Sequence, residues 1–308
     1  MTWSPRRWPA LAKPRPERSG GTGPLLDSAL LSQLELLSLD SLATIMGVLE
    51  GAHPGAPRAQ FAELTDYRGY QPGDDVALID WNAYARLDEL FVRTSSAHEG
   101  LTLTLLVDCS RSMTVPGHRK LRYAKRLAAA FGAVALLHSD AVRICALADG
   151  TAWPLPVLSG RGAVGRLLDD LEWLPSGGGT QLADSVRAGR LPEAGPGFAV
   201  LLSDLFMPGE QDEAVDWLGS SGTILHVIDP RDADPAPALG AGGTVELRDS
   251  ETGEVVVVGV TPALRRRYAE RFEARCEALS ARCAATGVRY MRAETTTGVA
   301  DLLFRAVS

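Results

Sequence analysis

Long apolar segments are missing from this 308-residue sequence. No run of residues approaches the roughly 20 apolar positions that a helix needs to cross a bilayer. Residues 1–24 contain two early arginines, but no apolar stretch follows them as it would in a secretory signal peptide. We therefore expect neither a membrane span nor a signal peptide.

Cysteine is also scarce, and the cysteines are too scattered to form a metal-binding motif. The four are Cys109, Cys145, Cys276 and Cys283, and no two of them form a CxxC pair. Single cysteines that behave as small buried apolar residues are typical of proteins in reducing compartments. This cysteine usage predicts a cytoplasmic location.

Positive charge is outweighed by negative charge over the whole chain. There are 31 Lys and Arg residues against 38 Asp and Glu residues, which gives a formal net charge of −7. Phosphate backbones require a basic surface, so we expect no nucleic acid partner. Residues 1–24 are the exception, since they are rich in proline and basic residues. Such a composition cannot bury a core, and we expect a disordered tail there.

What the sequence does contain is a regular alternation of apolar strands and helices after residue 98. The strands are expected at 101–108, 141–149, 198–204, 223–230 and 288–294. Near-continuous apolar strands separated by helices are typical of a parallel sheet that is covered on both faces. The pattern predicts an α/β fold with a doubly wound, mainly parallel sheet over residues 99–308.

Two segments lie outside this alternation. Residues 25–98 predict an N-terminal helix and a smaller β-rich extension. Residues 243–260 predict a hairpin inserted at an edge of the sheet, because two β-branched runs flank a Glu-Thr-Gly turn. The long helix that follows the hairpin is expected to carry one apolar stripe. The stripe consists of Leu264, Tyr268, Phe272, Cys276, Leu279 and Cys283.

Oxygen-bearing side chains collect where the expected strands end. Asp108, Ser110 and Ser112 follow the first strand at alternate positions, in the sequence LLVDCSRSM. Thr180 lies in the glycine-rich segment SGGGTQL, and Asp204 closes the strand FAVLLSD. Ligands of open parallel sheets collect beyond the carboxyl ends of the strands, so we expect these five side chains to meet there.

The five side chains offer only oxygen, which suits a hard cation such as Mg²⁺, with Mn²⁺ as the alternative. We expect the hydroxyls of Ser110, Ser112 and Thr180 to bind the cation directly, while Asp108 and Asp204 hold its bound waters. Neutral direct ligands leave most of the positive charge of the cation uncompensated, so an Asp or Glu of a partner protein can complete the site. The simpler alternative is that the serines cap the following turn and Thr180 caps its helix.

Two blocks of sequence resemble known families. The segment DCSRS, together with Thr180 and Asp204, resembles the complete metal-ion-dependent adhesion site of von Willebrand factor A domains, which have a Rossmann-like fold. The block YQPGDDVALIDWNAYAR at 70–86 is similar to the hallmark of a bacterial family called domain of unknown function 58. Ala77 stands where that family usually has arginine. The similarity runs from about Leu30 to the C-terminus.

The resemblance implies a role and a partner. Members of this family are similar to proteins found beside MoxR-type AAA+ ATPases, which implies an adaptor in chaperone-like remodelling or complex assembly. The expected function is a non-enzymatic, Mg²⁺-dependent module for protein–protein interaction. It would bind such an ATPase, a target protein that offers an acidic side chain to the metal, or both.

Two alternatives stay open. A metal-dependent hydrolase or phosphotransferase would use the cation as a Lewis acid, but the only nucleophiles on offer are serines that are already expected ligands. A structural subunit would carry the same residues with a non-functional metal site.

Overall fold

The structure is a computed structural model that describes residues 23–35, 66–69, 91–94 and 102–305. The last range has gaps at 116, 139, 178, 180–181, 188–196, 206–209, 220–221, 234–242 and 251. The first 22 residues of the expected tail, the family block at 70–86 and Thr180 therefore lie outside the described residues.

Contacts within the chain define two units, of which the smaller is Ala52–Leu101. Its described residues form one pair of strands. β1 (Asp66–Gly69) pairs antiparallel with β2 (Phe91–Thr94), and Tyr67 lies opposite Arg93.

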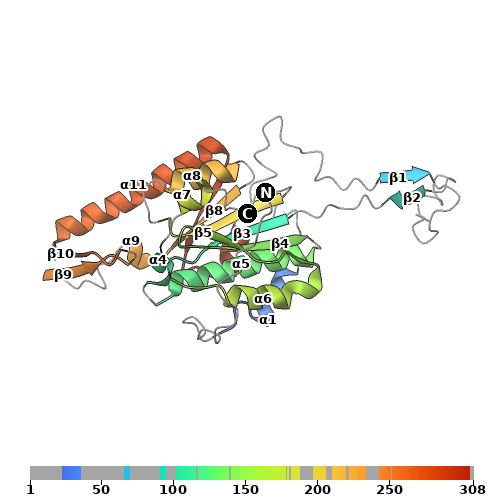
Figure 1. Cartoon of the computed structure of the whole chain (residues 1–308), viewed down its shortest axis with the longest axis horizontal. Helices are drawn as coiled ribbons and strands as arrows, with labels where there is room; N and C mark the ends of the chain where they lie inside the picture. The colour runs from blue at the N-terminus through green and yellow to red at the C-terminus, as the bar shows by residue number, and fades with distance from the viewer. Residues whose placement is uncertain are drawn as a thin grey trace, which may run out of the picture. The chain divides into compact units, whose positions relative to one another are not determined.

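The larger unit contains a seven-stranded sheet (Figure 1). Its strands follow the order β11-β8-β7-β3-β4-β5, and β6 also pairs with β4. The first five strands are parallel, while β5 and β6 run antiparallel to β4. The strands are β3 (Thr102–Asp108), β4 (Ala141–Ala148), β5 (Thr151–Pro154), β6 (Leu158–Ser159), β7 (Gly197–Ser203), β8 (Gly222–Ile228) and β11 (Arg289–Glu294). A mixed α/β fold with a mostly parallel central sheet is thus confirmed, although the two short antiparallel strands were not predicted.

Helices cover both faces of this sheet (Figure 1). On one face α5 packs against the central strands, and α1, α6 and α12 pack against α5. On the other face lie α7, α8 and α11, which contact β5, β8 and β11 respectively. The helices are α1 (Ser28–Leu34), α4 (Arg111–Thr114), α5 (Arg119–Leu137), α6 (Val164–Glu172), α7 (Leu182–Arg187), α8 (Glu210–Leu218), α9 (Pro230–Ala233), α11 (Pro262–Thr286) and α12 (Val299–Arg305), with a 3₁₀ turn η3 (Arg161–Ala163).

The central position of β3 explains its sequence. It pairs with β4 on one side and β7 on the other, and every residue from 103 to 108 is buried. A strand covered on both faces has no solvent-facing side, so its residues are apolar until the sheet ends. Asp108 is the first acidic side chain at that end, and the strand order places it between the ends of β4 and β7.

The segment expected as an edge hairpin forms a sheet of its own. β9 (Gly243–Arg248) pairs antiparallel with β10 (Val255–Val260), and Glu246 lies opposite Val257. The expected hairpin over residues 243–260 is therefore present, and its insertion at an edge of the central sheet stays a prediction. Among the described residues, neither strand pairs with a strand of the central sheet.

α11 follows the hairpin, and only the second half of its expected apolar stripe is buried. Cys276, Leu279 and Cys283 are at most 4% exposed, whereas Leu264 near the start of the helix is 39% exposed. Figure 1 shows the hairpin and the first half of α11 reaching away from the central sheet. The first half therefore has no sheet beneath it to cover its apolar side chains.

Candidate metal-binding site

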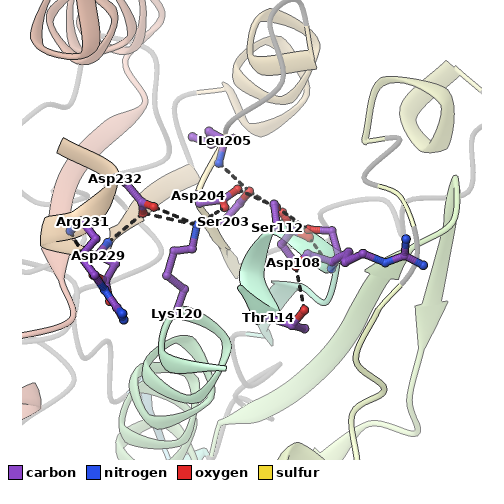
Figure 2. A network of polar contacts seen from close by, with 12 residues as sticks. Asp108, Ser112, Thr114, Lys120, Ser203, Asp204, Leu205, Asp229, Arg231 and Asp232 are labelled. Carbon is purple, nitrogen blue, oxygen red and sulfur yellow. Dashed lines mark hydrogen bonds and ion pairs between the residues drawn. The ribbon is translucent and has the colours of Figure 1, made fainter. Parts of the chain in front are cut away.

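The site is built on Asp108, whose side chain is held at the end of β3 by two hydrogen bonds. The carboxylate accepts from the backbone N–H of Ser110 at 2.9 Å and from the hydroxyl of Ser203 at 2.6 Å. Ser203 is the last residue of β7, so one carboxylate joins the ends of two neighbouring strands (Figure 2). Burial, and then the nearby charge of Asp204, raise the pKa of Asp108 to about 7. A cation bound beside this carboxylate would restore its ionised form.

The predicted hydroxyls lie beside the second carboxylate. The Ser110 and Ser112 hydroxyl oxygens are 3.0 Å apart, and Ser112 donates to the carboxylate of Asp204 at 3.2 Å. Ser110 occupies the N-cap position of α4, but its side chain makes no capping hydrogen bond. The side chain of Ser110 therefore does not cap α4. Four of the five predicted residues, Asp108, Ser110, Ser112 and Asp204, come together at the strand ends.

The fifth predicted residue, Thr180, is outside the described residues, but its neighbours are placed. The backbone N–H of Gly177 donates to the carbonyl of Cys109 at 3.0 Å. Gly179 exchanges two hydrogen bonds with Asp149, at 2.8 and 2.9 Å. These bonds hold Gly177 and Gly179 next to the residues that follow β3 and β4. A role for Thr180 at the site stays a prediction.

A buried lysine was not predicted and lies directly against the site. Lys120 of α5 is 4% exposed, and its ammonium group is 2.7 Å from the carboxylate of Asp204 and 3.3 Å from that of Asp232 (Figure 2). Burial alone would lower the pKa of Lys120, but the two carboxylates outweigh it and raise that pKa above its usual value. The lysine is thus a fixed positive charge at the edge of the site.

The sequence carried a signal for this lysine. Lys120 stands four residues before Ala124 and seven before Leu127, which places all three on one side of α5. All three side chains are buried. A charged residue on an apolar helical stripe indicates a buried partner, although charges at the start of a helix are usually solvated.

Acidic residues that follow β8 extend the network. The backbone N–H of Asp229 donates to Asp232 at 3.0 Å, and the carboxylate of Asp229 pairs with Arg231 at 3.0 Å and Arg119 at 3.4 Å. Burial raises the pKa of Asp232. Burial would also raise the pKa of Asp229, but its bonds to Arg231 reverse the effect and hold that pKa below its usual value. Lys120 and these arginines thus pair with the carboxylates at the end of β8, and Lys120 pairs with Asp204 as well.

The backbone that presents Asp204 is tightly held. Its carbonyl oxygen lies 3.0 Å from Nε2 of His226, and the other ring nitrogen lies 2.7 Å from the Tyr290 hydroxyl. Burial lowers the pKa of His226 to about 4, so the ring is neutral near pH 7. The next residue, Leu205, has a φ of 46°, and its carbonyl accepts hydrogen bonds from Gln211 and Arg275. A bulky residue in the left-handed region is strained, and such strain persists where several contacts fix the backbone.

The donor set fits a hard cation better than a transition metal. Among the described residues, no group of three or more His, Cys, Asp or Glu side chains is placed to hold a metal ion. A cation here would rely on hydroxyl oxygens as well as carboxylates. In an octahedral Mg²⁺ site with metal–oxygen distances of about 2.0–2.1 Å, adjacent ligand oxygens are about 2.9 Å apart. The 3.0 Å between the hydroxyls of Ser110 and Ser112 matches that spacing.

Comparison with known proteins places the chain in a family. The profile of the family described as "Protein of unknown function DUF58" matches residues 66–278. The chain belongs to the DUF58 family. This DUF58 protein is 32% identical, over 261 residues, to uncharacterized proteins of Mycobacterium bovis and Mycobacterium tuberculosis. The match covers 80% of this chain and 79% of each relative.

One solved structure that this DUF58 protein resembles is named as an uncharacterized membrane spanning protein from Vibrio fischeri. The match covers 66% of this chain and 95% of that one, with 19% sequence identity and a TM-score of 0.21. A likeness this low carries no argument about fold or site. That name nevertheless contradicts the predicted cytoplasmic location, which is therefore corrected.

The physical reason for this correction is that cysteine usage and missing apolar runs cannot fix a location. Amphipathic surfaces and lipid anchors hold proteins at membranes without any spanning segment. Within the described part of this DUF58 protein, no helix is both long enough and apolar enough to cross a membrane.

Proposed function

We propose that this DUF58 protein is a Mg²⁺-dependent protein-recognition module with a von Willebrand factor A-like, Rossmann-like fold. The observation that carries the proposal is the linked set of oxygens at the strand ends. Ser110 contacts Ser112, Ser112 donates to Asp204, and Asp108 is fixed between β3 and β7. Such a set is typical of a metal-ion-dependent adhesion site, which the sequence DCSRS also resembles.

Hydroxyl and carboxylate side chains would have different roles in holding the cation. The hydroxyls of Ser110 and Ser112, with Thr180 as the third, would hold Mg²⁺ or Mn²⁺ directly. Asp108 and Asp204 would accept hydrogen bonds from its bound waters. The bound cation would supply one open position for a carboxylate.

Lys120 supports recognition of an acidic partner. Because its ammonium already pairs with Asp204, the site offers less negative charge than its carboxylates suggest. A cation held mainly by hydroxyls, next to a fixed positive charge, keeps a strong attraction for a further anion. The module is therefore suited to bind an Asp or Glu of another protein, with the surrounding surface deciding which protein.

The proposed partner is a MoxR-type AAA+ ATPase, a target protein of that ATPase, or both. This step is supported by the resemblance to MoxR-associated proteins. The protein would act as a non-enzymatic adaptor in chaperone-like remodelling or complex assembly.

Metal-dependent binding to the MoxR-type ATPase of the same organism tests the proposal. Titration calorimetry would measure binding in Mg²⁺, in Mn²⁺ and with chelator, for the natural protein and for Ser112→Ala and Thr180→Ala. Thr114→Ala is the matched control, because this hydroxyl lies two residues from Ser112 but donates only to the Arg111 carbonyl, at 2.7 Å. We expect binding with Mg²⁺ that chelator, Ser112→Ala and Thr180→Ala abolish and that Thr114→Ala preserves.

Other outcomes would point to the alternatives. Equal binding with chelator and by every variant would favour a structural subunit. Hydrolysis of a generic phosphoester that Asp108→Ala removes would favour the metal-dependent hydrolase or phosphotransferase.

A further inference from the structure

The β9–β10 hairpin exposes an unusual amount of apolar side chain. Val255, Val256 and Val257 are 42%, 52% and 67% exposed, and Leu247 on the paired strand is 43% exposed. Side chains of successive residues in a strand point to opposite faces, so the three valines leave both faces of β10 apolar. An isolated two-stranded hairpin is marginally stable in water, and a third strand or further packing is usually required.

The two edges of this hairpin differ in chemistry. β9 carries Glu246 and Arg248, which form an exposed ion pair at 3.7 Å. Charged residues of this kind protect an edge strand from pairing with other chains. β10 has the sequence VVVVGV, with no charge and no proline. Within the described residues its outer edge pairs with no strand. β10 is therefore the edge that is open to a further strand.

We propose that β10 pairs with β10 of a second copy of this chain. The two strands would run antiparallel about a two-fold axis near Val257 and join the hairpins into one four-stranded sheet. Such a contact is isologous, since the same surface serves both subunits. Valine would face valine across the axis, and no charged side chain of β10 would be buried.

The charges at the two ends of the hairpin fit this antiparallel arrangement. The turn end of each hairpin carries Asp249 and Glu254, while the other end leads into α11, where Arg266 and Arg267 are exposed. Antiparallel pairing brings the turn end of one copy beside the start of α11 in the other. The first turn of α11 has no acidic residue, although acidic groups are stabilising at a helix N-terminus. The acidic turn of the second copy would supply that charge.

The pairing would also bring two candidate metal sites into one assembly. Arg111, between Ser110 and Ser112, donates to the carbonyl of Ser250 in the hairpin turn at 3.2 Å. Each hairpin is thus attached to the site of its own subunit. A dimer would present two sites to a partner, and linked sites bind far more tightly than single ones when the geometry allows both to engage. The pairing itself does not depend on the proposed metal-dependent function.

Light scattering coupled to size-exclusion chromatography tests the proposal on the full chain over a wide concentration range. We expect a dimer for the natural protein and a monomer for Val257→Lys. Val157→Lys is the matched control, because Val157 is 50% exposed but lies between β5 and β6, and it should remain dimeric. Circular dichroism would show that both variants are folded.

A second variant tests the register without relying on loss of the dimer. The four natural cysteines are buried, so an introduced surface cysteine would be the accessible one. Under oxidation, Val257→Cys should give a disulfide-linked dimer on a non-reducing gel, and Val157→Cys should not. A natural protein that is monomeric at every concentration would overturn the proposal and leave the edge of β10 to a strand of another protein. A dimer that survives Val257→Lys would also overturn it.

Discussion

At the scale of single residues, the environment of Asp108 disfavours the ionised form of its carboxyl group. Burial and Asp204 raise its pKa from 3.8 to about 7. The folded chain therefore binds this proton more tightly than the unfolded chain does. In the absence of a cation, the contribution of Asp108 to stability is fully present below its unfolded pKa, near pH 4, and is lost as the pH rises towards 7.

We predict that Asp108→Asn stabilises the metal-free protein in alkaline solution. Asparagine keeps the shape but carries no charge, so the free energy of unfolding at about pH 8 should rise by roughly 1–4 kcal/mol. Near pH 4 it should change little, because Asp108 is protonated in the folded state there. Urea unfolding with chelator at both pH values measures this difference. An equal change in the free energy of unfolding at the two pH values would contradict the raised pKa of Asp108.

Lys120 gives a second prediction at this scale. Lys120→Met would leave the buried Asp204 and the half-buried Asp232 without their ammonium partner and should cost about 3–5 kcal/mol of stability. Mg²⁺ can replace part of the lost charge, so its addition should raise the Tm of this variant by more than that of the natural protein. Differential scanning calorimetry with and without Mg²⁺ measures the two shifts.

Lys125→Met is the matched control for that experiment. Lys125 is also fully buried, but its ammonium donates to the carbonyls of Glu172 and Leu174, at 3.2 and 3.1 Å. This variant should lose stability without gaining a larger response to Mg²⁺. If all three proteins respond equally to Mg²⁺, Lys120 does not set the charge of the site.

The sequence predicted the acidic residues at the strand ends, but it did not predict the basic residues that neutralise their charge. Asp108 and Asp204 each close a near-continuous apolar run, so their positions at the carboxyl ends of the strands followed from the pattern. The pairing of Lys120 with Asp232 spans 112 residues and depends on how α5 packs against β8. No local pattern contains that information.

At the scale of secondary-structure elements, the pairing of β7 with β3 depends on one glycine. Gly197 begins β7 with a φ of 152°, and a Cβ atom there would lie 2.1 Å from the Thr102 carbonyl oxygen. Residues other than glycine rarely adopt this backbone conformation. The added Cβ atom would also meet backbone atoms of Thr102, which cannot rotate away as a side chain could. The start of β7 therefore tolerates no side chain.

We predict that Gly197→Ala lowers the free energy of unfolding by about 2–4 kcal/mol, through overpacking combined with backbone strain. Gly165→Ala in α6 is the control, because a Cβ atom there meets nothing within 4 Å. Alanine should leave stability unchanged or raise it by up to about 1 kcal/mol at that helical position. Guanidinium unfolding would measure both. If Gly197→Ala were as stable as the natural protein, β3 and β7 would be able to move apart without lowering the free energy of unfolding.

Elements that are covered on both faces were predicted best. β3, β7 and β8 are apolar along nearly their whole length because helices cover each side of the sheet. The exposure of Leu264 in α11 was not predicted. An apolar stripe indicates which face of a helix can be covered, but not whether a sheet extends beneath it.

At the scale of the whole molecule, the fold and the candidate site are separable. The core of the larger unit consists of apolar side chains from the sheet and its covering helices. The proposed cation would contact only side chains at the carboxyl ends of the strands of that sheet. The protein should therefore stay folded when metal is removed.

We predict that chelator leaves the circular dichroism spectrum unchanged and lowers the free energy of unfolding only by the binding contribution. That contribution is about 1.4 kcal/mol at a free Mg²⁺ concentration ten times the dissociation constant. Loss of the folded spectrum on chelation would show instead that the cation is part of the core structure.

The sequence also predicted the family and the mostly parallel sheet, because both depend on long stretches of pattern. The location of the protein was not predictable in this way. A location can depend on surfaces that recognise a membrane or a partner, and such surfaces leave no long apolar run in the sequence.

The central position of β3 has a consequence for the order in which the molecule can fold. The bond between Asp108 and Ser203 joins residues 95 apart, and the bond between Ser112 and Asp204 joins residues 92 apart. Contacts of such wide sequence separation slow folding, because a long loop must close before they form. On the ribosome, the DCSRS segment emerges well before the strand that completes its surroundings. A nascent chain that ends before β7 therefore carries the motif but not the site.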